Sequence, residues 1–272
     1  MRINEILTTK KLPQSTTPRL DLELLLAEVL HKPRSFIYAN SELELARAQE
    51  TAFQLLYERR LSGEPIAYIL GKKEFWSLEL TINEKVLIPR PETELLVELV
   101  LQLDYHHADM ADLGTGSGAI AIAIAKKQPN WHITATDISE DALQIARCNA
   151  QKLGAQNIEF YCGDWCEALP NKKYDVIISN PPYIANNDPH LRQGDITFEP
   201  KIALESGDGL DAIRKIINQA KGKLKAGGLI ALEHGYDQSE AIQELLQKNN
   251  YKDIVPYKDL ANIYRAITAS QN

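Results

Sequence analysis

The chain has 272 residues, of which 44% are hydrophobic and 25% charged, which is the composition of an ordinary globular protein. No apolar stretch approaches the roughly 20 residues of a membrane span, and no apolar signal core follows Met1, so we expect neither a membrane protein nor an exported one. Three cysteines (Cys148, Cys162 and Cys166) favour reduced thiols in the cytoplasm over a disulfide framework, and their spacing gives no reason to expect a metal site.

The net charge of −7 is distributed unevenly along the chain. Residues 1–75 carry a net charge of +1, whereas residues 76–272 carry −8. A groove for duplex nucleic acid needs Lys and Arg at the phosphates, so the acidic part is poorly suited to one. We therefore expect no direct nucleic-acid partner.

Residues 1–74 have the pattern of a small helical domain. Leucines recur at helical spacing over residues 19–30, after Thr17 as a cap and Pro18 in the first turn. Residues 41–44 form a possible capping box, which would open a long helix that ends near Gly63. A last short turn is possible over residues 65–70. We expect a bundle of four or five helices.

Residues 75–88 predict a β-hairpin that links two domains, with its turn at Asn83 and Glu84. The proline-containing segment 89–94 follows, and residues 92–103 have an amphipathic helical pattern. From residue 108 strands alternate with helices. Strands are expected at 109–113, 131–136, 158–162, 174–179 and 229–233, and helices at 117–127, 139–153, 209–223 and 237–248.

This alternation predicts an α/β domain over residues 89–272 with a mostly parallel sheet. Residues 251–255 and 263–269 are strand-like and have no helix between them, so an antiparallel pair is expected to close the sheet. Residues 119–125 alternate Ala and Ile like a strand. We assign them to a helix because two parallel strands need a crossover there.

A glycine-rich turn, Asp-Leu-Gly-Thr-Gly-Ser-Gly at 112–118, joins the first strand to the first helix. Asp137 ends the second strand, where its carboxylate could accept hydrogen bonds from ribose hydroxyls. Together they indicate a cofactor that contains adenosine, and they do not by themselves exclude a nicotinamide dinucleotide. Asp164 and Trp165 follow the third strand, where they could hold an adenine or be an ordinary surface pair.

The sequence Ser-Asn-Pro-Pro-Tyr at 179–183 ends the fourth strand abruptly, since two prolines cannot continue a sheet. The result is a rigid corner at the carboxyl end of a strand, where open α/β sheets bind ligands. An ordinary strand exit is the alternative. Residues 184–208, which include Asp188, Arg192, Phe198 and Glu199, form a long connection that suits a lid or a docking loop.

These motifs resemble those of the class I S-adenosylmethionine-dependent methyltransferases. Further stretches resemble the HemK/PrmC family, the protein-(glutamine-N5) methyltransferases of peptide chain release factors: Gly-Glu-Pro-Ile-Ala-Tyr-Ile-Leu-Gly at 63–71, Phe-Trp at 75–76, Ile-Pro-Arg-Pro-Glu-Thr-Glu at 88–94, and Phe-Glu-Pro at 198–200 followed by Ala-Leu at 203–204. The resemblance implies a Rossmann-like, seven-stranded, mostly parallel sheet whose last strand is antiparallel. It also implies S-adenosyl-L-methionine as cofactor and S-adenosyl-L-homocysteine as product.

By this resemblance the substrate is the glutamine of a Gly-Gly-Gln loop in release factors 1 and 2, which a monomeric enzyme would grip partly with its helical domain. The Asn180 side-chain oxygen and the Pro181 carbonyl would accept the two N–H bonds of the amide, while Tyr183 packs on its face. The implied residues are, for catalysis, Asn180, Pro181 and Tyr183; for the cofactor, Gly114, Thr115, Gly116, Ser117, Gly118, Asp137, Trp165 and Asn180; and for the substrate, Asn180, Pro181, Pro182 and Tyr183.

Three other functions compete with this one. A nucleic-acid base methyltransferase (adenine-N6 or guanine-N2) would use the same corner on a flipped base, against the charge of residues 76–272. A module that binds the cofactor without chemistry would not need Asn180 and Tyr183. A nicotinamide dehydrogenase would need an acid or base residue that the sequence does not offer.

Overall fold

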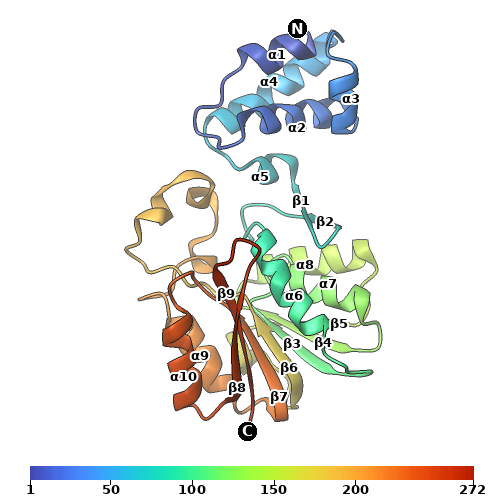
Figure 1. Cartoon of the computed structure of the whole chain (residues 1–272). Helices are drawn as coiled ribbons and strands as arrows, with labels where there is room; N and C mark the ends of the chain where they lie inside the picture. The colour runs from blue at the N-terminus through green and yellow to red at the C-terminus, as the bar shows by residue number, and fades with distance from the viewer. The chain divides into compact units, whose positions relative to one another are not determined.

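A computed structural model describes all 272 residues, which form two compact units (Figure 1). The helical unit comprises residues 1–72 together with the separate segment 192–198, and the sheet unit comprises residues 73–191 and 199–272. None of the helices combines the length and the hydropathy needed to cross a lipid bilayer. All three cysteines are free.

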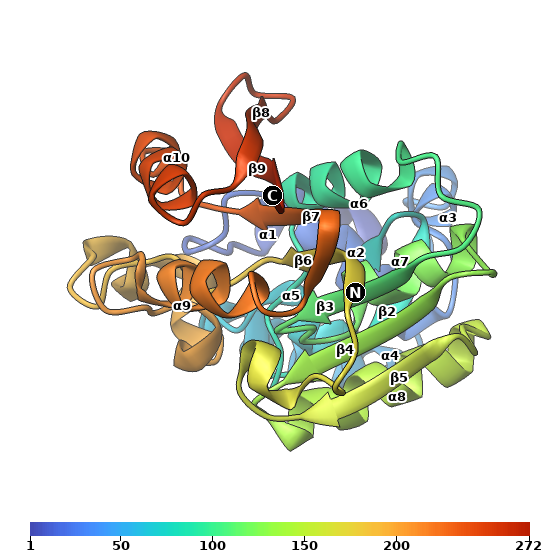
Figure 2. The same ribbon diagram turned by 90° about the horizontal axis from the view of Figure 1, so that it is seen from below.

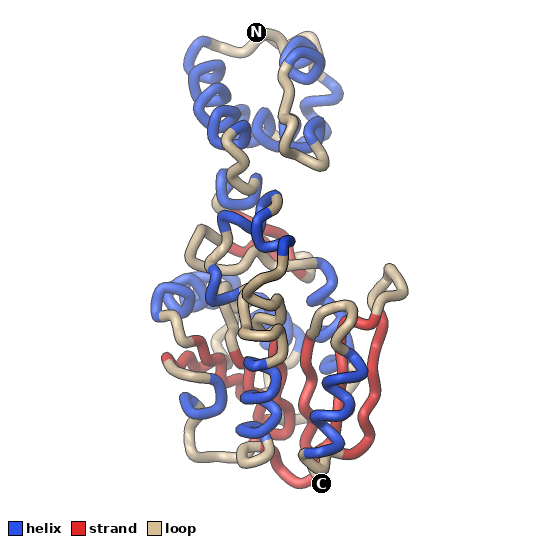
Figure 3. The backbone as a smooth tube through the Cα atoms, turned by 90° about the vertical axis from the view of Figure 1, so that its left-hand side faces the viewer, coloured by secondary structure: helices blue, strands red, loops and turns tan.

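The helical unit is built from helices and loops, which Figure 3 draws in blue and tan. The helices are α1 (Ile3–Thr9), α2 (Pro18–Leu30), α3 (Arg34–Ala39), α4 (Arg47–Leu61) and α5 (Ile66–Leu70). Their apolar sides meet in one core, whose largest fully buried side chains include Ile6, Leu25, Ile37 and Phe53. The expectation of four or five helices is confirmed.

The start of α4 differs from the expected one. The capping box predicted at residues 41–44 does not form, because the Leu43 carbonyl accepts a hydrogen bond from Ile3 and Glu44 pairs with Arg2 in a β-bridge. The helix begins at Arg47 instead, where the side chain of Gln49 accepts a bond of 2.9 Å from the backbone N–H of Ala46. A long-range pairing therefore overrides the local signal.

A buried ion pair lies inside the helical unit. Arg60 Nε is 2.6 Å from Asp21 Oδ2, and the two side chains are only 5% and 3% exposed. The guanidinium also donates to the carbonyls of Gly63 and Glu64, and it lies 3.0 Å from Asp195 on the separate segment 192–198. One cation thus connects α2, the end of α4 and residues from far along the chain.

The β-hairpin lies earlier in the chain than predicted. Its strands are β1 (Lys72–Phe75) and β2 (Leu78–Thr81), and Asn83 and Glu84 lie outside it. The turn is Trp76–Ser77, and both residues have positive φ angles (51° and 58°), as a two-residue hairpin turn of type I′ requires. The prediction missed this turn because neither residue is a usual one for left-handed backbone. After the hairpin come a 3₁₀ turn, η1 (Pro91–Thr93), and α6 (Glu94–Leu101).

The large sheet has seven strands in the order β5-β4-β3-β6-β7-β9-β8 (Figure 2). They are β3 (Asp109–Leu113), β4 (His132–Asp137), β5 (Ile158–Cys162), β6 (Tyr174–Ser179), β7 (Leu224–Glu233), β8 (Lys252–Lys258) and β9 (Tyr264–Ser270). All neighbours pair in parallel except β9, which lies antiparallel between β7 and β8. The predicted sheet and its antiparallel last strand are confirmed.

Helices cover both faces of this sheet. On one side lie α6, α7 (Ala119–Lys127) and α8 (Glu140–Leu153), and on the other α9 (Asp211–Ala220) and α10 (Ser239–Lys248) (Figure 1). The Ala-Ile alternation is a helix as predicted, and every residue from Ala119 to Ala125 is buried.

Two strands are longer than expected, each for a local reason. Gly227 and Gly228 suggested a turn before the strand. In the structure they lie inside β7, at an irregularity in its pairing with β6, so the strand begins earlier, at Leu224. β8 continues through Pro256, which is tolerated because β8 is the edge strand of the sheet.

Candidate active site

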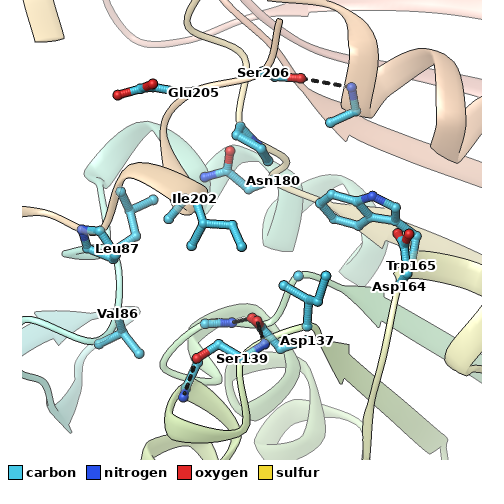
Figure 4. A pocket seen from close by; sticks show the side chains of 18 of the residues that line it. Val86, Leu87, Asp137, Ser139, Asp164, Trp165, Asn180, Ile202, Glu205 and Ser206 are labelled. Atoms are coloured by element: carbon cyan, nitrogen blue, oxygen red, sulfur yellow. Dashed lines mark hydrogen bonds between the residues drawn. The ribbon is translucent and has the colours of Figure 1, made fainter. Parts of the chain in front are cut away.

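A pocket of about 370 Å³ opens in the sheet unit at the carboxyl ends of β3, β4 and β6. In Figure 4 Asp137 lies on one side of it and Asn180 on the opposite side, with Trp165 and Leu87 flanking the space between them. This is the edge at which parallel sheets bind ligands, and the volume suits a ligand the size of a nucleoside.

The glycine-rich turn forms the base of the pocket. The backbone N–H groups of Gly114 and Thr115 donate to the carbonyl of Thr136 over 2.8 and 2.9 Å, which ties the turn to β4. Gly114 and Gly116 have φ angles of +71° and +56°, a region that only glycine enters at low cost, and both line the pocket. Their bare backbone is what a ligand would meet.

The other residues of the turn do not line the pocket and instead contact neighbouring elements. The Thr115 hydroxyl donates to Oδ2 of Asp112 over 2.7 Å, and the backbone N–H of Ala121 donates to the same oxygen. The Ser117 carbonyl accepts a bond from the side chain of Asn149, and Gly118 packs against α7 and α8. Among the five residues predicted from this turn, the structure therefore brings Gly114 and Gly116 to the pocket and leaves Thr115, Ser117 and Gly118 behind them.

The carboxylate of Asp137 stands at the pocket wall as predicted. Its Oδ2 accepts from the backbone N–H of Gly116 and its Oδ1 from that of Ser139, both at 2.9 Å. Burial raises the pKa of this carboxyl group, although the backbone donors act in the opposite direction. Each oxygen keeps a further lone pair, so the group can also accept hydroxyls from a ligand.

Trp165 lines the pocket on the side of η2 (Trp165–Ala168). Its ring lies over Gly114 so closely that a Cβ on that glycine would be 2.9 Å from it. Asp164 also lines the pocket, but its carboxylate is held in an ion pair with Lys215 of α9. The ring is thus free to offer its face to a ligand, whereas the acid already has a partner.

The corner after β6 divides its residues between the pocket and the core. Asn180 and Pro182 line the pocket, while Pro181 is buried and Tyr183 packs against the main core of the sheet unit. Asn180 Nδ2 donates to Thr93 Oγ1 over 3.0 Å, and the Tyr183 hydroxyl donates to Oε1 of Glu233 over 3.2 Å. Burial, with the nearby carboxylate, raises the pKa of Tyr183, which keeps its hydroxyl protonated as a donor.

The returning half of the long connection forms one wall. Pro200, Ile202, Ala203, Glu205 and Ser206 line the pocket, and Ile202 lies beside Leu87 from the segment after the hairpin (Figure 4). Glu199 fastens this wall, because its buried carboxylate accepts from the backbone N–H of Ile88 and pairs with Arg90. The connection contains three 3₁₀ turns, η3 (Pro189–Arg192), η4 (Gly194–Phe198) and η5 (Lys201–Ala203).

Several residues at the site were assigned no role in the sequence analysis. Thr93 and Glu233 contact Asn180 and Tyr183 across separations of 87 and 50 residues, and no local spacing links them. Two signals were available: Thr93 lies in the segment 88–94 that carries the resemblance, and Glu233 is an acidic residue at the end of a strand, as Asp137 is. Ile138, the next residue after Asp137, also lines the pocket and is 55% exposed.

Comparisons with known proteins agree with this architecture. Residues 7–71 match the PrmC N-terminal domain family, and residues 91–207 match the methyltransferase small domain family. Among solved structures, a methyltransferase from Pyrococcus furiosus is 20% identical with a TM-score of 0.56, covering 79% of this chain and 97% of that one. A ribosomal protein L11 methylase from Lactobacillus delbrueckii has a TM-score of 0.50 at 22% identity and covers 66% of this chain and 78% of that one.

The sheet order, the antiparallel last strand and these structural neighbours define a class I methyltransferase fold. Much more similar sequences narrow the class. Proteins named release factor glutamine methyltransferase from Coxiella burnetii, Pseudomonas aeruginosa and Escherichia coli are 51%, 46% and 43% identical to this chain. The matches cover 94%, 98% and 92% of this chain and 92%, 97% and 91% of the relatives. The chain belongs to the family of release factor glutamine methyltransferases.

Proposed function

We propose that this chain transfers a methyl group from S-adenosyl-L-methionine to the side-chain amide nitrogen of the glutamine in the Gly-Gly-Gln motif of peptide chain release factors 1 and 2. The corner at Asn180 carries the proposal. Its Nδ2 is engaged by Thr93, so its oxygen is left to accept a hydrogen bond at the pocket wall. The names of the relatives support a release factor as substrate.

The pocket fits the proposed cofactor. No atom lies within 4 Å of a Cβ built on Gly116, so a ligand can approach the backbone of the turn closely. Asp137 would accept the ribose hydroxyls, Trp165 would lie on the adenine, and Gly114 and Asn180 would border the reactive end. When bound, the cofactor supplies an electrophilic methyl group on a positively charged sulfur.

The protein's part is to make a poor nucleophile react. The nitrogen of an amide is unreactive because its lone pair is delocalised into the carbonyl. Acceptors on both N–H bonds, the Asn180 oxygen and the Pro181 carbonyl, hold the nitrogen in line and return electron density to it. The amide nitrogen would take the methyl group as the bond from its carbon to sulfur breaks, which leaves S-adenosyl-L-homocysteine, and the nitrogen would release one of its two protons to water. A preorganised, largely dry corner then supplies most of the rate enhancement.

The remaining parts of the chain have proposed roles as well. Residues 1–74 would recognise the release factor, residues 75–88 would link the domains, and residues 89–272 would carry out the transfer. The connection 184–208 would be the docking loop at the pocket. We propose that a single chain acts as the enzyme in the cytoplasm.

Methylation of a nucleic-acid base is not favoured. The relatives that cover nearly the whole chain are named for release factor glutamine, and the sheet-containing part of the chain is acidic. A base methyltransferase would have to hold a phosphate backbone beside the same corner, and that requires positive charge.

The test is a mass-spectrometric peptide map of a release factor after incubation with the protein and S-adenosylmethionine. Asn180→Ala is the test variant, and Asn171→Ala, at an exposed asparagine before β6 and outside the pocket lining, is its matched control. One added methyl group on the Gly-Gly-Gln glutamine is expected with the unmodified protein and with Asn171→Ala, and none with Asn180→Ala. An unmethylated glutamine despite measurable cofactor binding would refute the substrate assignment.

A further inference from the structure

Asn180 is held from behind by residues that do not line the pocket. The hydroxyl oxygen of Thr93 accepts the 3.0 Å bond from Asn180 Nδ2, and Thr93 is only 4% exposed. Thr93 ends the turn η1, at the start of α6. The 3₁₀ turn that leads into α6 thus holds a side chain at the end of β6.

The carboxylate of Glu233, at the carboxyl end of β7, lies close to the Thr93 hydroxyl. Glu233 is 1% exposed, its Oε1 accepts the bond from Tyr183, and its Oε2 has no hydrogen-bond partner. The Tyr183 hydroxyl donates the one hydrogen bond that this carboxylate receives, and the Thr93 hydroxyl lies close enough to lower the pKa of the group as well. A buried acid with few partners is costly, so its presence here calls for a role beyond packing.

We propose that Thr93 and Glu233 are positioning residues, which form a buried acceptor chain that fixes the amide of Asn180 with its oxygen toward the substrate. The inference rests on the proposed function and deepens it. It assigns the orientation of the accepting group to two side chains that touch neither substrate nor cofactor.

The physical argument is the near-symmetry of an amide. Turning the Asn180 amide by 180° exchanges oxygen and nitrogen with almost no change in shape, so packing alone does not choose between them. A hydroxyl has a single proton. An ionised Glu233 can only accept, and its buried Oε2 has no other partner, so the proposed chain directs the Thr93 proton to it and leaves Thr93 only lone pairs to offer Asn180. The nitrogen of Asn180 is therefore drawn to Thr93 and its oxygen is left for the substrate.

The reversed amide would oppose the reaction. It would place the Nδ2 donors of Asn180 against the N–H donors of the substrate amide, and the nucleophilic nitrogen would lose an acceptor. Loss of the chain should therefore slow the chemical step more than it weakens binding.

The kinetic test compares Thr93→Val, which removes the hydroxyl at nearly constant shape, with Thr93→Ser, which keeps it. We expect Thr93→Val to lower kcat about 10- to 100-fold, with KM for the release factor and the affinity for S-adenosylhomocysteine changed less than about threefold. Thr93→Ser should recover most of kcat. Thr134→Val is the control, because it removes another buried hydroxyl, in β4 and outside the pocket lining, and should leave kcat unchanged.

A second measurement does not depend on turnover. With ¹⁵N-labelled asparagine, the side-chain NH₂ signals of Asn180 are assigned by their loss in Asn180→Ala. One of the two protons should exchange slowly in the unmodified protein and in Thr93→Ser, and rapidly in Thr93→Val. Thermal unfolding of each variant shows that it is folded.

The outcomes separate the two proposals. A Thr93→Val protein with unchanged kcat and unchanged Asn180 exchange overturns the positioning role, as does a Thr93→Ser protein as slow as Thr93→Val. If the unmodified protein methylates no release factor, the proposed function fails, and the exchange measurement alone decides whether the acceptor chain exists.

Discussion

The backbone N–H of Gly116 donates to the Asp137 carboxylate over 2.9 Å, across 21 residues of sequence. This bond ties the glycine turn after β3 to the acidic end of β4, and both residues line the same pocket. This bond also fixes which way the carboxylate faces, since its other oxygen is held by Ser139.

Asp137→Asn should weaken binding of S-adenosylhomocysteine. The neutral amide keeps one acceptor oxygen but replaces the other with a donor, which faces the N–H of either Gly116 or Ser139. Loss of a hydrogen bond to a charged group costs about 1.5–3 kcal/mol, so we expect roughly a 10- to 100-fold rise in Kd by calorimetry. Glu140→Gln, at an exposed position three residues further on, is the control. Equal Kd values for both variants would contradict the role of Asp137.

Gly116→Ala and Gly154→Ala form a matched pair. The two glycines have φ angles of +56° and +68°, and no atom lies within 4 Å of a Cβ built on either. Both alanines should therefore cost about 1–2 kcal/mol of stability from left-handed backbone strain alone. Only the Gly116 Cβ would enter the pocket, so only Gly116→Ala should weaken the cofactor. Thermal unfolding and calorimetry measure the two effects, and equal cofactor affinity would count against the turn as a binding element.

Arg60 and Arg59 are adjacent in sequence, but the ion pair of Arg60 is buried and that of Arg59 is exposed. Arg60→Met leaves the buried Asp21 without its cation, and breaking such a pair costs about 3–5 kcal/mol. Arg59→Met breaks an exposed pair with Glu64, which contributes about 1 kcal/mol or less. Chemical denaturation followed by far-ultraviolet circular dichroism should show a large loss for the first and a small one for the second. Similar losses would mean that the buried pair adds little.

Stability should fall as pH rises from about 4.5 to about 7. Burial raises the pKa of Glu233 from 4.5 to about 7, so over this range the folded state keeps a proton that the unfolded state has lost. Burial also raises the pKa of Asp112 from 3.8 to about 7, with the same sign. Glu233→Gln should remove its share of the slope, about 1.4 kcal/mol per pH unit, in denaturation curves measured at several pH values. A slope unchanged by the substitution would show that Glu233 does not titrate in this range.

Ionisation of Glu233, which should lower the stability of the fold, should raise kcat. Only the ionised Glu233 is purely an acceptor, so kcat should rise with pH through about 7 while stability falls. The groups that act on this carboxylate are Thr93, Tyr183, Arg265 and Glu92, of which Glu92 raises its pKa and the other three lower it. A kcat that stays flat from pH 5.5 to 8 would contradict the link.

Local patterns were enough to predict the sheet and the pocket edge. Three strands, at 109–113, 158–162 and 174–179, begin and end where the sequence predicted, and glycine or proline follows each of them closely, at Gly114, Gly163 and Pro181. Gly116, Asp137, Trp165 and Asn180 meet at the pocket because the carboxyl ends of parallel strands meet at one edge.

The features that the sequence patterns did not predict depend on tertiary contacts or on unusual backbone dihedral angles. The Trp76–Ser77 turn has left-handed φ angles, which neither of these two residue types predicts. The start of α4 was displaced by pairing between residues 2–3 and 43–44. Thr93 and Glu233 reach the site through tertiary contacts, so no local spacing in the chain could have paired them with Asn180 and Tyr183.

The segment 192–198 makes the helical unit discontinuous in sequence, and this limits how the protein can be divided. A fragment that stops at residue 72 would lack Asp195, and Arg60 would lose one of its two acidic partners. A fragment that starts at residue 73 would keep a strip of chain that belongs to the missing unit. Swapping the helical unit between relatives therefore means transplanting two pieces of sequence together, the second of them from inside the loop that borders the pocket.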